Sequence, residues 1–368
     1  MMTWSEGETG VERRPVENGG GSVTSRRTFL QATAAATVLA PVAARRAAAQ
    51  ENTIAVNTWG GSWTAAEDVA YFKPFTEKTG IKITTVAPVS FAKLKAQVQT
   101  RNYEWDVSSL NSPEHRQAEQ EGLLEPVDWS VVNKANFGPN QLGTHGIGNV
   151  ALATGLVYRK DKFPAGGPKS WADFWDVKRF GGARSLYNRS FTSVAYGLLA
   201  DGVPTDKVFP LDVDRGFRKL DQIKPHIKVW WTQGNQSQQL LRDGEVDLMA
   251  IWNARANELS EQGLAVEFVW NQAESYSGSW FVPKGTPRAK NAWRFIDFAA
   301  QAKPQADFCT RLSYGPLNPK AFDFIAPAQA RKMPTYPENL KVGFTPDAAW
   351  LGTNLPKLRE RFSQWLSS

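Results

Sequence analysis

We predict an α/β protein of two lobes with a cleft between them, and three observations support this fold class. Segments with strand and helix patterns alternate between residues 53 and 120, and again from residue 170 to about residue 270. A long β-prone stretch at residues 150–158 joins the two alternations. The chain has 368 residues, and a single hydrophobic core stops growing near about 250–300 residues. Two separate cores are therefore expected.

The N-terminal 49 residues carry the features of an export signal. Residues 1–24 are rich in Gly, Glu, Thr and Ser and hold too few apolar side chains to order themselves. Residues 25–30 read Ser-Arg-Arg-Thr-Phe-Leu, an Ala-rich run follows at 32–44, and residues 47–49 are all Ala. We predict a disordered n-region and a twin-arginine signal peptide over residues 1–49, cleaved after the Tat translocase exports the chain to the periplasm. A basic tail before an Ala-rich helix is the alternative, but it leaves the small-residue ending unexplained.

The remainder of the chain is predicted to be a soluble protein that does not bind nucleic acid. It has no apolar run of the about 18 residues that a membrane-spanning helix needs. Its basic residues are scattered among acidic ones and do not form runs with interleaved aromatic residues. Cys309 is the only cysteine, so no intramolecular disulfide can form, and its apolar setting predicts a buried position on a helix.

The first alternation begins with a strand at residues 53–59 that ends in Gly-Gly-Ser-Trp. A helix should follow, because Thr64 and Glu67 have the spacing of a capping box and apolar residues then recur at helical intervals. Pro74 falls inside that helix, so we expect a bend or an irregular turn there. Residues 81–86 alternate as a strand and complete a β-α-β unit, which favours a parallel sheet.

The same pattern then repeats. It predicts a helix at residues 91–101, a strand at 105–110, a turn at 111–113 and a helix through Gln120. The β-prone stretch at 150–158 follows, and we interpret it as a crossing from one lobe to the other.

The second alternation opens with a short helix at residues 170–175. It includes a helix that ends at Gly244 and a buried strand at 245–253, and the tail of the chain should form a helix at 354–365. We assign residues 52–154 with 281–322 to lobe 1, and residues 155–280 with 323–368 to lobe 2.

An enzyme is the competing class, since the twin-arginine route also exports hydrolases and metalloenzymes. Only His115, His145 and His226 are present, and none has a second His or Cys at metal-ligand spacing. The sequence has no G-x-S-x-G elbow and no nucleotide-binding glycine loop. We therefore expect no catalytic residue, no metal and no cofactor. Carboxylates are abundant, so a Tat-exported hydrolase stays a remote alternative.

Residues 52–368 resemble the spermidine/putrescine-type periplasmic substrate-binding proteins of ABC importers, which are extracellular solute-binding proteins. Each matching motif is weak alone, but together they stand in order and at compatible spacing. The motifs lie at residues 58–62, 75–80, 155–161, 169–176, 243–247, 252–253, 282–285 and 314–318.

The resemblance implies a periplasmic binding protein fold, with a hinge and an interlobe cleft that closes on a small solute. It also implies a monomer that performs no chemistry on the solute and hands it to the permease and ATPase subunits of an importer. A role in chemoreception in place of uptake is left open.

Candidate ligand-binding residues follow strand ends, because ligands of α/β sheets gather at the carboxyl ends of strands. The resemblance implies that aromatic rings at Trp59 and Trp252 form walls of the binding site, although buried core positions are the alternative. The full set of candidates is Trp59, Gly60, Ser62, Asn111, Ser112, Tyr187, Arg189, Trp252, Asn253, Arg255 and Tyr276.

The sequence departs from the polyamine-binding pattern, in which two regions supply carboxylates to the ligand. Neither residues 186–192 nor residues 275–280 contain an acid, and Arg189 stands in the first region. A guanidinium in a cleft favours a carboxylate or phosphate over an ammonium group, so we predict a solute with an anionic group. Two alternatives stay open. In the first, Arg189 is a surface residue that does not contact the solute. In the second, the protein binds spermidine or putrescine through acids at other positions, for which the candidates are Asp68, Glu104, Glu114 and Glu274.

Overall fold

A computed structural model describes residues 52–138 and 141–368 of the chain. The predicted signal peptide lies outside the described residues. The strands are β1 (Thr53–Asn57), β2 (Lys82–Val86), β3 (Ser108–Asn111), β4 (Ile147–Arg159), β5 (Arg184–Tyr187), β6 (Ile227–Trp231), β7 (Leu248–Trp252), β8 (Val266–Phe281) and β9 (Gly315–Pro316).

The helices alternate with these strands over most of the chain. They are α2 (Gly61–Glu67), α3 (Lys73–Thr79), α4 (Phe91–Thr100), α5 (Ser112–Gln120), α6 (Trp171–Trp175), α7 (Ser190–Ala200), α8 (Val213–Ile223), α9 (Gly234–Arg242), α10 (Asn253–Glu261), α11 (Ala289–Ala299), α12 (Ala302–Leu312), α13 (Pro327–Ala330), α14 (Pro337–Val342) and α15 (Ala348–Ser367). A π-helical segment, η1 (Asp68–Phe72), links α2 to α3, and short 3-10 turns lie at η2 (Lys134–Asn136), η4 (Thr205–Lys207), η5 (Lys224–His226) and η6 (Pro319–Phe324).

The first β-α-β unit is confirmed, but its helix begins differently from the prediction. β1 and β2 pair in parallel. The predicted capping box is wrong, because α2 starts after Gly60 and Thr64 lies inside the helix. Glu67 is buried and accepts a hydrogen bond from the Thr58 hydroxyl instead of capping the helix. The irregular turn expected near Pro74 is the π-helical η1, which runs without a break into α3. Pro74 is the second residue of α3 and has no N–H to donate to the preceding turn, so the irregularity falls just where a regular helical hydrogen bond is missing.

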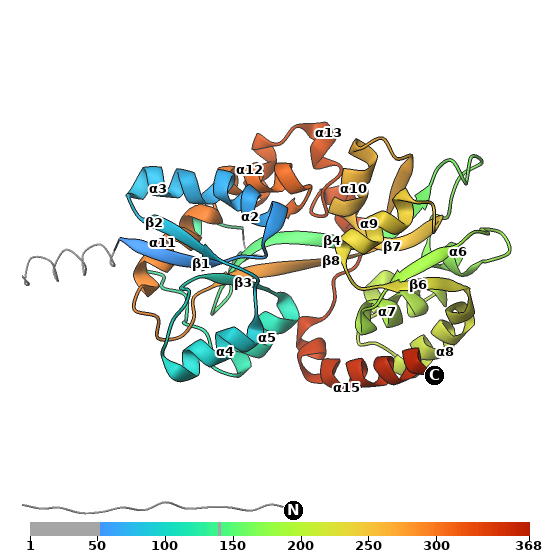
Figure 1. Cartoon of the computed structure of the whole chain (residues 1–368), viewed down its shortest axis with the longest axis horizontal. Helices are drawn as coiled ribbons and strands as arrows, with labels where there is room; N and C mark the ends of the chain where they lie inside the picture. The colour runs from blue at the N-terminus through green and yellow to red at the C-terminus, as the bar shows by residue number, and fades with distance from the viewer. Residues whose placement is uncertain (1–51, 139–140) are drawn as a thin grey trace, which may run out of the picture. The chain divides into compact units, whose positions relative to one another are not determined.

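Two long strands connect the two halves of the fold. The larger sheet has the order β3-β8-β4-β7-β5-β6, with β9 paired to β4. β4 and β8 pair antiparallel along most of their length (Figure 1). β3 pairs with the C-terminal end of β8, and β7 pairs with the C-terminal half of β4. The stretch predicted as a lobe crossing therefore lies within β4.

Separate hydrophobic cores occupy the two halves, so the two-lobe α/β fold is confirmed. The first core contains Val56, Phe75, Trp280, Trp293 and Phe308. The second contains Trp171, Phe174, Leu198, Leu220 and Phe362. Cys309 is buried in the first core, as predicted. Ile325, Ala330 and Met333 also pack in the first core, beyond the predicted boundary at residue 322, while the other predicted boundaries stay predictions.

The C-terminal helix is longer than predicted and lies beside both halves. α15 packs against α5 and against α7 (Figure 1). Its side chains Leu351, Leu355, Leu358 and Phe362 are buried in the second core. Pro356 lies inside the helix, where it lacks the N–H that would bond to the preceding turn.

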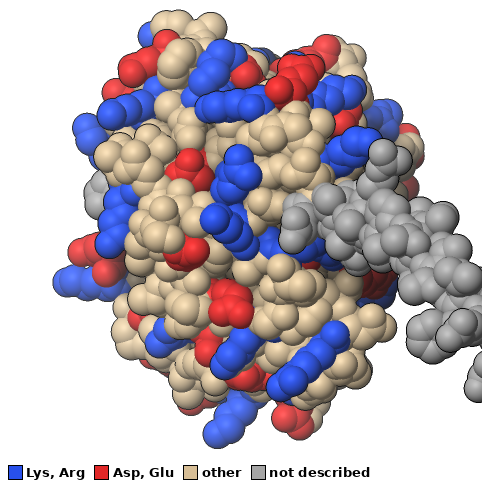
Figure 2. All heavy atoms as spheres, turned by 90° about the vertical axis from the view of Figure 1, so that its left-hand side faces the viewer, with Lys and Arg blue, Asp and Glu red and all other residues tan. Residues whose placement is uncertain are grey.

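The charged surface is mixed in sign. On the face drawn in Figure 2, Lys and Arg side chains lie among Asp and Glu side chains. Among the described residues, no helix is long and apolar enough to cross a membrane.

Candidate ligand-binding site

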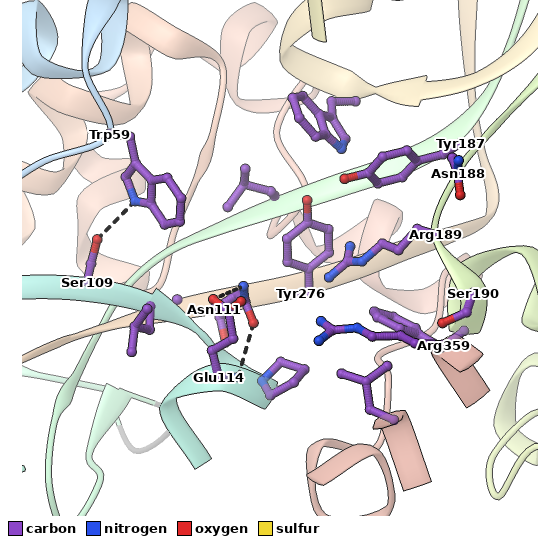
Figure 3. Close-up of a pocket in the computed structure, with 18 of the residues that line it drawn as sticks. Trp59, Ser109, Asn111, Glu114, Tyr187, Asn188, Arg189, Ser190, Tyr276 and Arg359 are labelled. Carbon is purple, nitrogen blue, oxygen red and sulfur yellow. Dashed lines mark hydrogen bonds between the residues drawn. The ribbon is translucent and has the colours of Figure 1, made fainter. Parts of the chain in front are cut away.

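A cavity of about 890 Å³ lies where the two halves meet, and residues from both halves line it. The loops and helix starts that follow β1, β3, β5 and β7 contribute to its wall, as does the middle of β8 (Figure 3). The cavity therefore lies at the carboxyl ends of strands, where ligands of α/β sheets gather. Its size is within the range of about 300–1,000 Å³ that is typical of small-molecule sites.

Trp59 forms one side of the cavity on a turn held by hydrogen bonds. Its indole N–H donates to the Ser109 hydroxyl at 3.2 Å. The adjoining Gly60 has a φ of 86°, which a side chain would disfavour, and its N–H donates to the Thr64 hydroxyl at 3.1 Å. The Trp59 side chain is nevertheless 43% exposed. A large aromatic face is therefore fixed in place and open to a ligand.

Glu114 supplies a negative charge on the same side. It lies at the start of α5, where Asn111 is the N-cap and accepts the Glu114 N–H. The Asn111 amide group also donates to the Glu114 carboxylate at 2.8 Å. Trp59, Asn111 and Glu114 together make an aromatic and acidic wall, which we call the first wall (Figure 3).

The opposite side of the cavity, the second wall, is aromatic and basic. Tyr187 stacks on Trp231 with centroids 4.1 Å apart, and both rings contact Trp252 edge-on. Arg255 also lines the cavity, but its guanidinium already contacts Glu258 at 3.2 Å and Gln238 at 3.3 Å. Arg255 is therefore less available to a ligand than its position alone suggests.

Arg189 points into the cavity from the second wall (Figure 3). Its guanidinium carbon lies 4.2 Å from the centroid of the Phe191 ring and 4.8 Å from that of Tyr276. Its side chain is only 18% exposed, so it is not the surface residue that the alternative foresaw. Aromatic packing on a planar guanidinium restrains its orientation while leaving N–H groups free to bind.

A buried carboxylate lies behind Arg189. Glu274 is fully buried, and its carboxylate is 3.7 Å from the Arg189 guanidinium. Burial raises the pKa of Glu274, and the charge of Arg189 opposes that rise. Residues 275–280 contain no acid, and Glu274 is the residue just before them. It does not line the cavity, so Arg189 presents its positive charge to the cavity and Glu274 faces it from behind.

The N-terminus of α7 adds to the positive character of this wall. Arg189 is the N-cap residue of α7 but makes no side-chain capping hydrogen bond. Ser190 lines the cavity, and its buried hydroxyl has no hydrogen-bond partner among the described residues. Uncapped N–H groups and the positive end of the helix dipole favour an anion at this position.

Nine of the eleven sequence candidates line the cavity. The other two, Ser112 and Asn253, do not. The Ser112 hydroxyl donates to the Ser277 carbonyl at 2.7 Å. Asn253 is buried, where it accepts from the Ala153 N–H and donates to the Ser313 carbonyl. Both are structural bonds that the strand-end argument could not distinguish from ligand contacts.

Several lining residues were not among the candidates. Trp63 and Tyr314 lie with ring centroids 5.3 Å apart, and Arg359 comes from α15. Trp63 directly follows the candidate Ser62 in the sequence, but no signal in the tail helix marks Arg359. Within residues 52–138 and 141–368, no group of three His, Cys, Asp or Glu side chains is placed to hold a metal ion.

Comparison with known families and proteins identifies relatives of this fold and site. The family model described as bacterial extracellular solute-binding protein matches residues 70–338. The γ-aminobutyric acid-binding protein of Pseudomonas aeruginosa is 33% identical over 329 residues, which is 88% of this chain and 93% of that protein. The spermidine/putrescine-binding periplasmic protein of Escherichia coli is 21% identical over 294 residues, covering 75% of this chain and 82% of that protein.

Solved structures of substrate-binding proteins share this fold. An ABC transporter substrate-binding protein from Bradyrhizobium japonicum has a TM-score of 0.82 and 36% identity, covering 85% of this chain and 99% of that chain. The Atu4243-GABA receptor has a TM-score of 0.79 and 34% identity, covering 86% of this chain and 98% of that chain.

Proposed function

The chain belongs to the family of bacterial extracellular solute-binding proteins, and we propose that it binds a small amino acid with separated amino and carboxylate groups, such as γ-aminobutyric acid. We further propose that it works in the periplasm as a monomer and passes the solute, chemically unchanged, to the permease and ATPase of an ABC importer. That role requires a cleft that binds and releases its ligand.

Arg189 carries the proposal for a carboxylate. A partly buried guanidinium packed between aromatic rings and beside the uncapped start of α7 gives an anion both charge and N–H donors. Glu274 lies 3.7 Å away on the far side, which is too long for a strong hydrogen bond. Donors of Arg189 therefore stay available to a ligand carboxylate.

The first wall supports an amino group at the other end of the solute. Glu114 supplies the carboxylate, and the exposed face of Trp59 suits a cation, because a cation over an indole ring gains about 0.5–2 kcal/mol. A zwitterion that spans the cavity would contact both walls, and a ligand that touches both lobes drives closure. Of the relatives, two are named for γ-aminobutyric acid, and both exceed 30% identity.

Thermal unfolding with a panel of solutes tests this proposal. We expect γ-aminobutyric acid to raise the melting temperature, since a ligand at 100 times its Kd stabilises the folded state by about 2.7 kcal/mol. Putrescine and spermidine should have little effect, and so should butylamine, which lacks the carboxylate. Stabilisation by butylamine equal to that by γ-aminobutyric acid would rule out recognition of the carboxylate.

Polyamine binding is the second candidate, and two acids favour it. Glu114 lines the cavity and Glu274 lies behind it, and both were named as relocated acids from the sequence. The positive charge of Arg189 between Glu274 and the cavity opposes this candidate. Strong stabilisation by putrescine or spermidine, with none by carboxylates, would favour the polyamine and exclude the amino acid.

A further inference from the structure

We propose that Arg359 of α15 supplies a second guanidinium to the anion subsite around Arg189. This inference rests on the proposed function, because it concerns how the same carboxylate is held. It makes the C-terminal helix part of the specificity of the cleft. Arg359 lies beyond residue 338, where the match to the family model ends.

The geometry places Arg359 at the subsite. Arg359 lines the cavity, and in Figure 3 its guanidinium points into the same part of the cavity as that of Arg189, toward Asn111 and Glu114. The helix that carries it is firmly seated, since Leu355, Leu358 and Phe362 around it are buried in the second core. The packing of α15 therefore fixes where Arg359 stands on the backbone, and its exposed side chain reaches the cavity from there.

The other arginines nearby have an acid within 4 Å of the guanidinium, closely in two cases and loosely at Arg189. Arg255 contacts Glu258 at 3.2 Å, and Arg361, two residues along α15, contacts Asp214 at 2.6 Å. Arg189 has Glu274 behind it at 3.7 Å. Arg359, by contrast, has no ion-pair partner among the described residues.

Two guanidinium groups that face one cavity repel each other until an anion lies between them. A carboxylate there gains hydrogen bonds from both, and charge-assisted bonds of this kind are roughly twice as strong as neutral ones. An ammonium group at the same place meets two positive charges. Arg359 is thus expected to strengthen carboxylate binding and to disfavour polyamines.

The helix also links this subsite to the first wall. α15 packs on α5, where Gly352 lies close to Arg116 and Gln120. Glu114 and its N-cap Asn111 are at the start of α5. One helix therefore lies against the element that holds the acid and also carries one of the arginines.

The test compares Arg359→Gln with Lys357→Gln in the full exported protein. Lys357 is exposed on the same helix and does not line the cavity, so its substitution removes one positive charge without touching the subsite. Calorimetric titration with γ-aminobutyric acid should show that Arg359→Gln weakens binding at least about tenfold, while Lys357→Gln changes it less than about twofold. The ligand-free Arg359→Gln protein should melt no lower than the unaltered protein, because the change relieves like-charge repulsion.

Arg189→Gln separates the two proposals. If Arg189→Gln abolishes binding and Arg359→Gln binds like the unaltered protein, the proposed role of Arg359 is wrong and the proposed function stands. Equal losses of affinity in Arg359→Gln and Lys357→Gln would also overturn the role of Arg359, because the effect would then come from the net positive charge of the protein and not from a contact in the subsite. If neither γ-aminobutyric acid nor any other carboxylate tested, succinate and acetate included, stabilises or binds the unaltered protein, both proposals fail.

Discussion

The two walls of the cavity differ in how completely their polar groups are satisfied. On the first wall, the Trp59 indole bonds to Ser109 and the Glu114 carboxylate bonds to Asn111. On the second wall, the Ser190 hydroxyl and the Trp252 indole N–H have no partner among the described residues. A satisfied wall keeps its shape without a ligand. Unsatisfied buried donors, in contrast, destabilise the folded protein until a group accepts their hydrogen bonds. The first wall is therefore preformed, whereas the second wall keeps donors that the proposed anionic ligand would satisfy.

Next to the preformed wall, Glu67 is buried and bonded to Thr58, the residue before Trp59, and its titration gives the largest expected effect on stability. Burial raises the pKa of Glu67 from 4.5 to about 8, and the hydrogen bond from Thr58 partly offsets that rise. Above about pH 4.5 the unfolded chain loses a proton that the folded protein keeps. Stability should therefore fall as the pH rises from about 4.5 to about 8, by at most about 5 kcal/mol, and then level off.

Urea unfolding between pH 5 and 9 checks this expectation. Glu67→Gln should remove the fall, whereas Glu77→Gln, exposed on α3, should keep it. Identical pH profiles for Glu67→Gln and the unaltered protein would show that burial does not keep Glu67 protonated in the folded protein.

The unsatisfied wall should give the largest effect on binding. Arg189→Gln removes the charge that faces the cavity, and removing one partner of a buried charged hydrogen bond costs about 2–5 kcal/mol. We expect the Kd for γ-aminobutyric acid to rise about 30-fold or more by calorimetry. Arg255→Gln is the control, since Arg255 is already bonded to Glu258 and Gln238. A greater loss in the control would place the carboxylate at Arg255.

Trp59→Ala tests the aromatic part of the first wall. Because Trp59 is 43% exposed, its loss should leave the fold intact and should weaken binding about 3- to 30-fold, the equivalent of one cation–π contact. Trp129, which is 38% exposed and does not line the cavity, provides the matched Trp→Ala control. Unchanged affinity in Trp59→Ala would remove the ring from the ligand site.

The smallest effect is expected at Glu114. A Gln at this position still accepts the Asn111 hydrogen bond but carries no charge. We expect γ-aminobutyric acid to bind about three- to tenfold more weakly, and butyrate, which lacks the amino group, to bind with the affinity it has for the unaltered protein. A similar loss for butyrate would mean that Glu114 shapes the wall and does not contact an ammonium group.

Much of the fold followed from sequence patterns because the strands are short, apolar and separated by clear turn residues. The β1–β2 unit and the crossing in β4 are examples. The start of α2 was misjudged because Thr64 and Glu67 have capping-box spacing but serve tertiary bonds. The hydroxyl of Thr64 accepts from Gly60, and Glu67 accepts from Thr58. Spacing along the chain cannot distinguish these two uses.

The candidate site was partly predictable for a related reason. Strand-end patterns pointed to Trp59 and Trp252, the departure from the polyamine-binding pattern pointed to Arg189, and the structure brings all three to one cavity. Arg359 could not be found this way, because its position depends on how a helix 170 residues from Arg189 packs across the second core. Glu274 was among the candidate acids, but its position behind Arg189 is a tertiary contact that the sequence does not show.

The most direct test is a structure of the protein purified without unfolding, with whatever solute it retains in the cavity. We expect a carboxylate within hydrogen-bonding distance of the Arg189 guanidinium, and the other end of the solute against Trp59. A diamine lying between Glu114 and Glu274, or a solute whose uncharged end faces Arg189, would contradict the account.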